Sequence, residues 1–196
     1  MKKNLRDKVV HKKVVDGIYN TSKMLLQISD EHVTKHFKST SNSTTRRYHL
    51  EKQALSRLEN TPGTPSLYYH DDNNRTLQMS RLPGVSATYL SVQNLMDLAV
   101  IVENMLASGV ARHSMPIRDI VVDEGGQLGL VDFERTTLCK ARWRPDWLIA
   151  KAVTRYHLYR LMNQYQPQML NRRQFLLVAM GSKLRGFVFF IHSLSN

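Results

Sequence analysis

Short apolar runs separated by polar turns occupy the first third of the chain. Residues 24–28 and 32–37 flank a Ser29-Asp30 turn, as the two arms of a β-hairpin do. Further strand-like segments precede and follow this hairpin, at residues 13–19, 66–69 and 76–79. The pattern predicts a small antiparallel sheet.

One helix interrupts these strands. Within residues 46–58, the apolar side chains recur on one helical face, at Leu50, Ala54, Leu55 and Leu58. The Ser/Thr/Asn-rich residues 38–45 have no apolar period, so we expect a loop there. The proline- and glycine-containing residues 61–65 end the helix.

The pattern changes from strand-like to helical after residues 80–84, which read as a linker. Residues 95–108 and the sequence from Pro145 onward carry apolar side chains at helical spacing. Between them, a loop at 109–118 precedes two strand-like runs joined by a Gly-Gly turn, at residues 120–122 and 128–133.

This order of elements predicts one α+β domain with two lobes. We expect a strand-rich lobe over residues 1–79, a hinge at 80–84 and a helical lobe over 85–196. A ligand-binding cleft is expected at the hinge.

The charge of the chain adds a class of partner to this picture. Its 28 Lys and Arg residues exceed its 16 Asp and Glu residues, for a formal net charge of +12. Such an excess favours phosphate-rich partners, whether nucleic acid, anionic lipid or phosphorylated glycan, although it also serves general solubility. Nucleic acid is not favoured, because no arginine-rich arm with interleaved aromatic residues is present. The single cysteine, Cys139, excludes an internal disulfide and argues against a zinc cluster.

Membrane-spanning segments are not predicted. The longest apolar runs, at residues 175–180 and 187–191, are far shorter than the ~20 residues that cross a bilayer. The first 15 residues are basic and lack the apolar core of a secretory signal. We therefore expect a soluble, cytoplasmic protein, with peripheral contact to the inner membrane surface left open. Residues 183–190 could lie in a membrane interface or pack within the helical lobe.

Two aspartates flank the predicted hairpin of residues 120–133. Asp132 begins Asp132-Phe133-Glu134 at the end of the second strand, and Asp119 directly precedes the first strand. A carboxylate held on a strand end, like that of Asp132, suits Mg²⁺, which prefers oxygen ligands. The alternative for Asp119 is a turn residue that starts the strand.

This order of loop, hairpin and Asp-Phe-x resembles the protein-kinase-like superfamily, and it is most similar to small bacterial lipopolysaccharide-core sugar kinases. The resemblance implies ATP and Mg²⁺ as cofactors. It places Asp132 at the metal-binding aspartate and Asp119 at the metal-binding asparagine of the catalytic loop. Ser114 then stands where the catalytic aspartate is expected. The Ser114 hydroxyl, Asp119 or assistance from the substrate could compensate for the missing base. Glu134 replaces the glycine of Asp-Phe-Gly.

The same resemblance assigns residues of the first lobe to the nucleotide. Lys35 corresponds to the strand lysine that binds phosphates, and Glu51 to the helix glutamate that orients it by an ion pair. Gly17 belongs to a phosphate loop with one glycine instead of three. Met79 and Arg81 fall at the hinge, where an adenine ring would bind backbone groups. Taken singly, Lys35 and Glu51 could equally be a surface lysine and an unrelated helix carboxylate.

These observations leave three functions open. The first is an atypical kinase that phosphorylates a lipopolysaccharide-core sugar or another anionic glycan or small-molecule acceptor. The second is a pseudokinase that acts as a nucleotide-responsive or scaffold module for a protein partner. The third, a binder of nucleic acid or a membrane surface, depends on charge alone. Arg142 follows Asp132 too soon for a long phosphorylatable loop, which argues against a regulated protein kinase.

Overall fold

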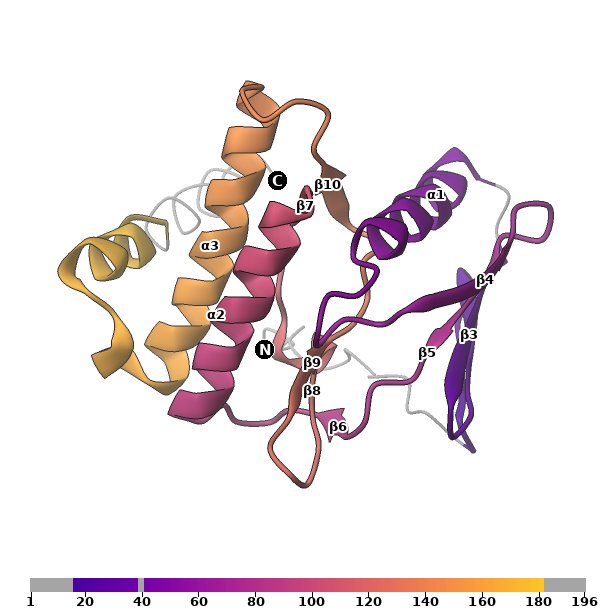
Figure 1. Cartoon of the computed structure of the whole chain (residues 1–196), viewed down its shortest axis with the longest axis horizontal. Coiled ribbons are helices and arrows are strands. Elements are labelled where there is room, and N and C mark those ends of the chain that lie inside the picture. Colours follow the sequence, from indigo (N-terminus) through magenta and orange to yellow (C-terminus); the bar gives the residue numbers. More distant parts are fainter. Residues whose placement is uncertain (1–15, 39–40, 182–196) are drawn as a thin grey trace, which may run out of the picture.

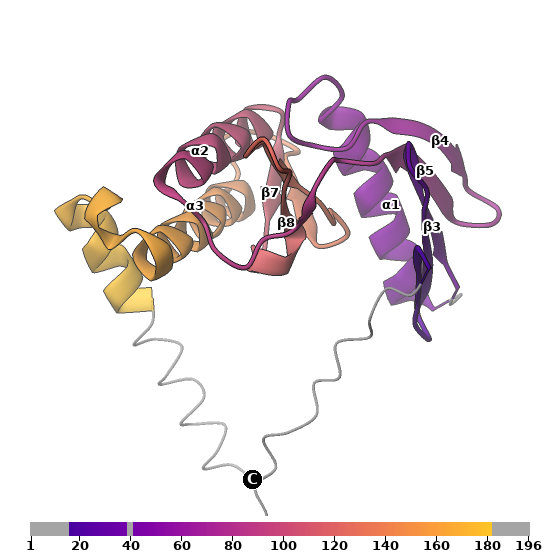
Figure 2. The same cartoon turned by 90° about the horizontal axis from the view of Figure 1, so that it is seen from below.

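The computed structural model of the chain describes residues 16–38 and 41–181. Its elements form two groups, one around helix α1 (Asn42–Arg57) and one around helices α2 (Val92–Ala107) and α3 (Pro145–Tyr165) (Figure 1). Figure 2 shows the two groups from below, with the strand-rich group on the right and the helical group on the left. The expected α+β, two-lobed architecture is confirmed.

A five-stranded antiparallel sheet forms the first lobe, in the order β1-β2-β3-β5-β4. Its strands are β1 (Ile18–Asn20), β2 (Met24–Ile28), β3 (His32–Phe37), β4 (Leu67–Asp71) and β5 (Thr76–Ser80). The predicted hairpin of residues 24–37 is confirmed. Its second arm, β3, is the central strand, and it places Lys35 between Leu26 of β2 and Leu77 of β5.

The strand predicted at residues 13–19 is shorter than expected. Residues 13–15 lie outside the described part of the chain. Asp16 and Gly17 form a turn with φ of 50° and 73°, which is not a strand conformation, so β1 begins at Ile18.

Helix α1 begins four residues earlier than the apolar period predicts, so the expected loop at residues 38–45 is wrong for 42–45. The Ser41 side chain accepts a hydrogen bond from the Thr44 backbone N–H and caps the helix. A polar first turn is thereby stabilised without an apolar pattern. On its inner face, Tyr48 packs edge-on against Phe37 of the sheet, with ring centroids 5.8 Å apart.

Helices dominate the second lobe. α2 starts at Val92 rather than Leu95 because Ser91 and Asn94 form a reciprocal capping box. α3 packs beside it, and residues 172–181 are also helical. The core between α2 and its neighbours consists of fully buried side chains that include Leu95, Leu98, Val102 and Met105.

Two very short strands, β7 (Val110–Arg112) and β10 (Thr136–Leu138), pair with each other and lie against α3. The predicted loop at 109–118 is therefore wrong for residues 110–112. Three residues are too few to show a period of two, so the sequence carries no signal for either strand.

The predicted hairpin around the Gly-Gly turn is confirmed as β8 (Ile120–Val122) and β9 (Leu128–Leu130), with β6 (Val85–Ser86) added at the edge. β9 ends before residue 133 because Asp132 has φ of 66°. Ser80 still belongs to β5, and residues 81–84 connect the sheet to β6.

None of the helices formed by the described residues is long and apolar enough to cross a bilayer. The segment at 183–190, considered for a membrane interface, lies outside those residues.

Candidate active site

Lys35 lies at the centre of a buried charge network that we call the Lys35 network. Its Nζ lies 2.7 Å from Glu51 Oε2, 3.0 Å from Asp132 Oδ1 and 3.7 Å from Glu134 Oε2. The Lys35 side chain is only 5% exposed. The ion pair between Lys35 and Glu51 that the resemblance implies is present, and Asp132 joins it from the second lobe.

The electrostatics of this network follow from its burial. Burial opposes the charged form of Lys35, but Asp132, Glu51 and Glu134 outweigh it and raise the Lys35 pKa above its usual range. Lys35 is therefore a permanent cation. Burial raises the pKa of Glu51 to about 7, although Lys35 opposes this shift. Burial likewise acts to raise the pKa of Asp132, but Lys35 outweighs it and lowers that pKa, so Asp132 is ionised.

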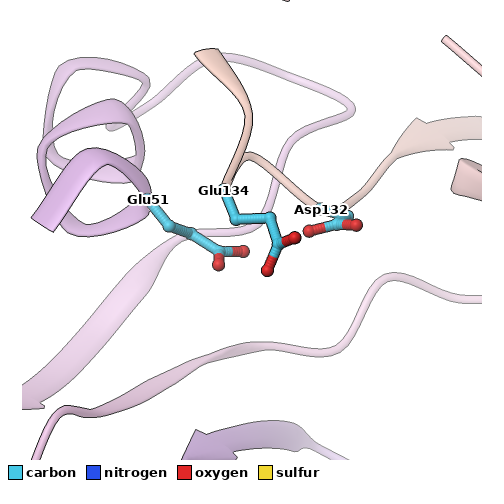
Figure 3. Close-up of side chains that lie close together, drawn as sticks. All are labelled: Glu51, Asp132 and Glu134. Carbon is cyan, nitrogen blue, oxygen red and sulfur yellow. The ribbon is translucent and has the colours of Figure 1, made fainter. Parts of the chain in front are cut away.

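Glu134 is a member of the network that the sequence marks only as a departure from Asp-Phe-Gly. Its side chain is buried, and one carboxylate oxygen accepts a hydrogen bond from Arg47 of α1 at 3.4 Å. Within the described residues, the other oxygen has no hydrogen-bond partner and faces Lys35. Figure 3 shows Glu51, Asp132 and Glu134 converging on one point. No periodic pattern could have identified this contact, because Arg47 and Glu134 are far apart in the chain.

The backbone between Asp132 and Glu134 fixes this convergence. Asp132 has the left-handed conformation that non-glycine residues seldom adopt. The next residue, Phe133, is fully buried, and its backbone N–H donates to Glu51 Oε1 at 3.3 Å. Helix α1 is thus tied to this segment through both Glu51 and Arg47.

Asp119 lies at the end of the short 3₁₀ helix Ile117–Asp119 and is held by Arg112. The Arg112 guanidinium donates to Asp119 Oδ2 at 2.7 Å and to the Val131 carbonyl at 2.8 Å, and it stacks 5.3 Å from the Phe133 ring centroid. Val131 in turn donates its backbone N–H to the Asp119 carbonyl at 2.9 Å. Arg112, absent from the sequence-based assignment, therefore ties the two aspartates' segments together. Burial raises the pKa of Asp119 to about 6 against the opposing charge of Arg112.

The carboxylates that lie close enough together to bind a divalent cation surround Lys35. The three carboxylates of the Lys35 network offer oxygens within 4.8 Å of one another. The Lys35 ammonium group already occupies the space between these oxygens. Asp132 is different because its side chain is 41% exposed, although enough protein atoms surround it for burial to act on its pKa. Asp119 is also paired with a cation, because Arg112 lies 2.7 Å from its Oδ2. The assignment of Asp132 and Asp119 as ligands of a hard cation stays a prediction from the resemblance.

The structure shows no hydrogen bond or ion pair between the Lys35 network and the other described residues that the sequence singled out. Ser114 is half-buried two residues after Arg112. Met79 is buried in β5, opposite Val33. The Arg81 guanidinium donates to the Ser29 carbonyl at 3.0 Å, so its side chain is directed to the β2–β3 turn and not to Lys35.

Gly17 has a structural reason for being glycine. Its φ is 73°, and a Cβ there would lie 2.5 Å from the Ile28 carbonyl oxygen. This turn at the start of the sheet therefore requires glycine whether or not a phosphate approaches it.

Comparison with known proteins adds a fold relationship. No family model and no curated protein matches the sequence. Among solved structures, the chain is similar to a 2.2 Å crystal structure of WbdD, with 18% identity and a TM-score of 0.54 over 85% of this chain and 44% of that one. A crystal structure of monomeric WbdD gives 16% identity and a TM-score of 0.51 over 82% and 45%.

WbdD is described as a bifunctional kinase-methyltransferase. The chain spans less than half the length of the WbdD chains that it matches. At this identity the likeness concerns the fold. The chain has a two-lobed, protein-kinase-like fold, which it shares with part of WbdD.

Proposed function

We propose that this chain is an atypical kinase-like phosphotransferase that uses Mg-ATP and phosphorylates an anionic acceptor such as a lipopolysaccharide-core sugar. The observation that carries the proposal is the Lys35 network, in which a buried cation is held between Glu51 and Asp132. The kinase-like fold and the net charge of +12 support it.

The residues of the chain would divide the work as follows. Lys35, kept charged and oriented by Glu51, would bind phosphate oxygens of the nucleotide. Asp132 and Asp119 would hold Mg²⁺, which supplies neutralisation of phosphate charge. Backbone groups near Met79 and Arg81 would bind the adenine, and Gly17 would shape the turn beside the phosphates.

The site lacks the usual general base for proton removal from the acceptor hydroxyl, because Ser114 occupies the position of the usual aspartate. A general base contributes roughly 10²–10⁴-fold to the rate, so its absence slows transfer without abolishing it.

A transfer assay with radiolabelled ATP, Mg²⁺ and purified lipopolysaccharide-core glycan tests the proposal. Wild type should label the glycan, and Asp132→Asn should reduce labelling by about 100-fold or more, since most of the rate in phosphoryl transfer comes from charge neutralisation and positioning. Lys140→Ala, at an exposed lysine outside the network, should leave labelling unchanged. Nucleotide binding without any labelled product would instead favour a binding module without turnover.

A further inference from the structure

Two exposed basic residues lie side by side where β7 and β10 meet. Thr136 pairs with Arg112, and the next step of the ladder brings the His113 N–H to the Arg135 carbonyl at 3.3 Å. Residues opposite each other in an antiparallel pair project to the same face. Arg112 and Thr136 face the buried side, so His113 and Arg135 share the exposed side.

A third basic residue, Arg46, comes to the same place from helix α1. Its neighbour Arg47 contacts Glu134, which brings the first turns of α1 beside the segment that carries Arg135. Arg46 is itself exposed. Burial, together with the charges of Arg135 and Arg46, lowers the pKa of His113, as expected where all three groups lie within electrostatic range.

This cluster of Arg46, His113 and Arg135 has no acidic counterpart in the described part of the chain. Neither arginine has a carboxylate there within ion-pair distance, whereas other arginines do: Arg47, Arg81, Arg112, Arg118, Arg144 and Arg155. Adjacent unpaired cations repel each other. An anion that accepts hydrogen bonds from both guanidinium groups would relieve that repulsion.

The position of the cluster relates it to the acceptor. His113 directly precedes Ser114, the residue that the resemblance puts at the base position, so the cluster is next in the chain to the proposed catalytic loop. Thr137 Oγ1 lies 2.6 Å from His113 Nε2 and fixes the imidazole toward β10. The cluster is separate from the Lys35 network, whose charges come from other side chains.

We propose that Arg46, His113 and Arg135 bind a phosphomonoester already carried by the acceptor, next to the hydroxyl that is phosphorylated. A phosphate has three terminal oxygens and can accept from two guanidinium groups and an imidazole at once. The acceptor class is therefore a phosphorylated sugar rather than a neutral one. The role of the cluster in binding the acceptor rests on the proposed function. Its binding of a phosphate group can be measured without nucleotide.

Nuclear magnetic resonance of the full chain labelled at histidine provides the test. Glucose 6-phosphate and glucose are titrated separately at constant ionic strength, and His113→Gln identifies the His113 signals. We expect glucose 6-phosphate to shift these signals saturably with a Kd of about 1 mM, and glucose to leave them unchanged. Arg46→Gln and Arg135→Gln should each weaken binding by roughly fivefold to tenfold, because each removes one charge-assisted contact. Arg172→Gln, at an exposed arginine in the second lobe, should bind like wild type.

The absence of a saturable shift in wild type would overturn the proposal, as would equal shifts with glucose or undiminished binding when Arg46 and Arg135 are replaced together. Repeating the titration with Asp132→Asn separates the two proposals. Asp132→Asn should keep glucose 6-phosphate binding while it loses Mg-ATP binding. Glucose 6-phosphate binding in a wild-type protein that binds no Mg-ATP would leave this subsite in place and contradict only the proposed function.

Discussion

Glu134 contributes a third carboxylate to a site that contains two cations. Glu51, Asp132 and Glu134 face Lys35, and Arg47 adds a second positive charge from the edge. With all groups ionised, the network has one surplus negative charge. That surplus, added to burial, explains why the pKa of Glu51 rises to about 7, since both Asp132 and Glu134 act in this direction.

This shift gives folding stability a pH dependence whose sign can be stated. The pKa of Glu51 is raised from 4.5 to about 7 on folding, so between these values the folded state binds more protons than the unfolded state. The contribution of Glu51 to stability is therefore present below pH 4.5 and is lost as pH rises through 7. We expect the difference in unfolding free energy between wild type and Glu51→Gln to change by an amount on the order of 1–3 kcal/mol across this range. Urea unfolding at pH 5 and pH 7.5 measures it, and parallel pH profiles of the two proteins would show that Glu51 does not titrate there.

At the scale of elements, helix α1 is the part that connects the two lobes. Glu51 and Arg47 bind the Asp132–Glu134 segment through a hydrogen bond and an ion pair. Arg57, at the end of the helix, binds two carbonyls of the second lobe. The Arg57 guanidinium donates to the carbonyls of Gly109 and Cys139, both at 3.0 Å. These carbonyls flank the β7–β10 pair, so the same helix positions the two strands that adjoin His113 and Arg135.

Removal of the Arg57 contacts should therefore destabilise the fold. Arg57→Ala loses two charge-assisted hydrogen bonds, which are worth about 1.5–3 kcal/mol each. Partial exposure and replacement by water reduce this, and we expect a loss of about 1–3 kcal/mol in urea unfolding. Lys52→Ala is the matched control on the same helix, because its ion pair with the exposed Asp72 contributes about 1 kcal/mol or less. Equal losses of unfolding free energy in the two variants would show that the Arg57 hydrogen bonds do not stabilise the contact of α1 with the second lobe.

How far the sequence predicts the elements depends on their length and termini. The hairpin of β2 and β3 and the hairpin of β8 and β9 have clear turn signals, and both are found where expected. The start of α1 is missed because a side-chain cap, not an apolar period, sets it. β7 and β10 are missed because their pairing joins segments far apart in the chain, which leaves no local pattern.

At the scale of the whole molecule, the sequence predicts the motif residues of the candidate site better than it predicts the side chains that contact them. Lys35, Glu51, Asp119 and Asp132 could be selected from motif order, and the structure brings Lys35, Glu51 and Asp132 into contact. Arg112 and Glu134 could not, because each acts through a contact that depends on packing between lobes. The net charge of +12 indicates an anionic partner but not its place on the surface. The pairing of β7 with β10 brings Arg135 next to His113, the residue that precedes Ser114.

The most direct test of the central claim is the thermal stability of the full chain with and without Mg-ATP. A ligand that binds only the folded state at about 100 times its Kd stabilises it by about 2.7 kcal/mol and raises the Tm. We expect this rise in wild type and in Lys140→Ala, and its loss in Lys35→Met and Asp132→Asn, with ligand-free melting curves showing that both variants fold. No rise in wild type, or an undiminished rise in both network variants, would contradict a nucleotide site built on Lys35 and Asp132.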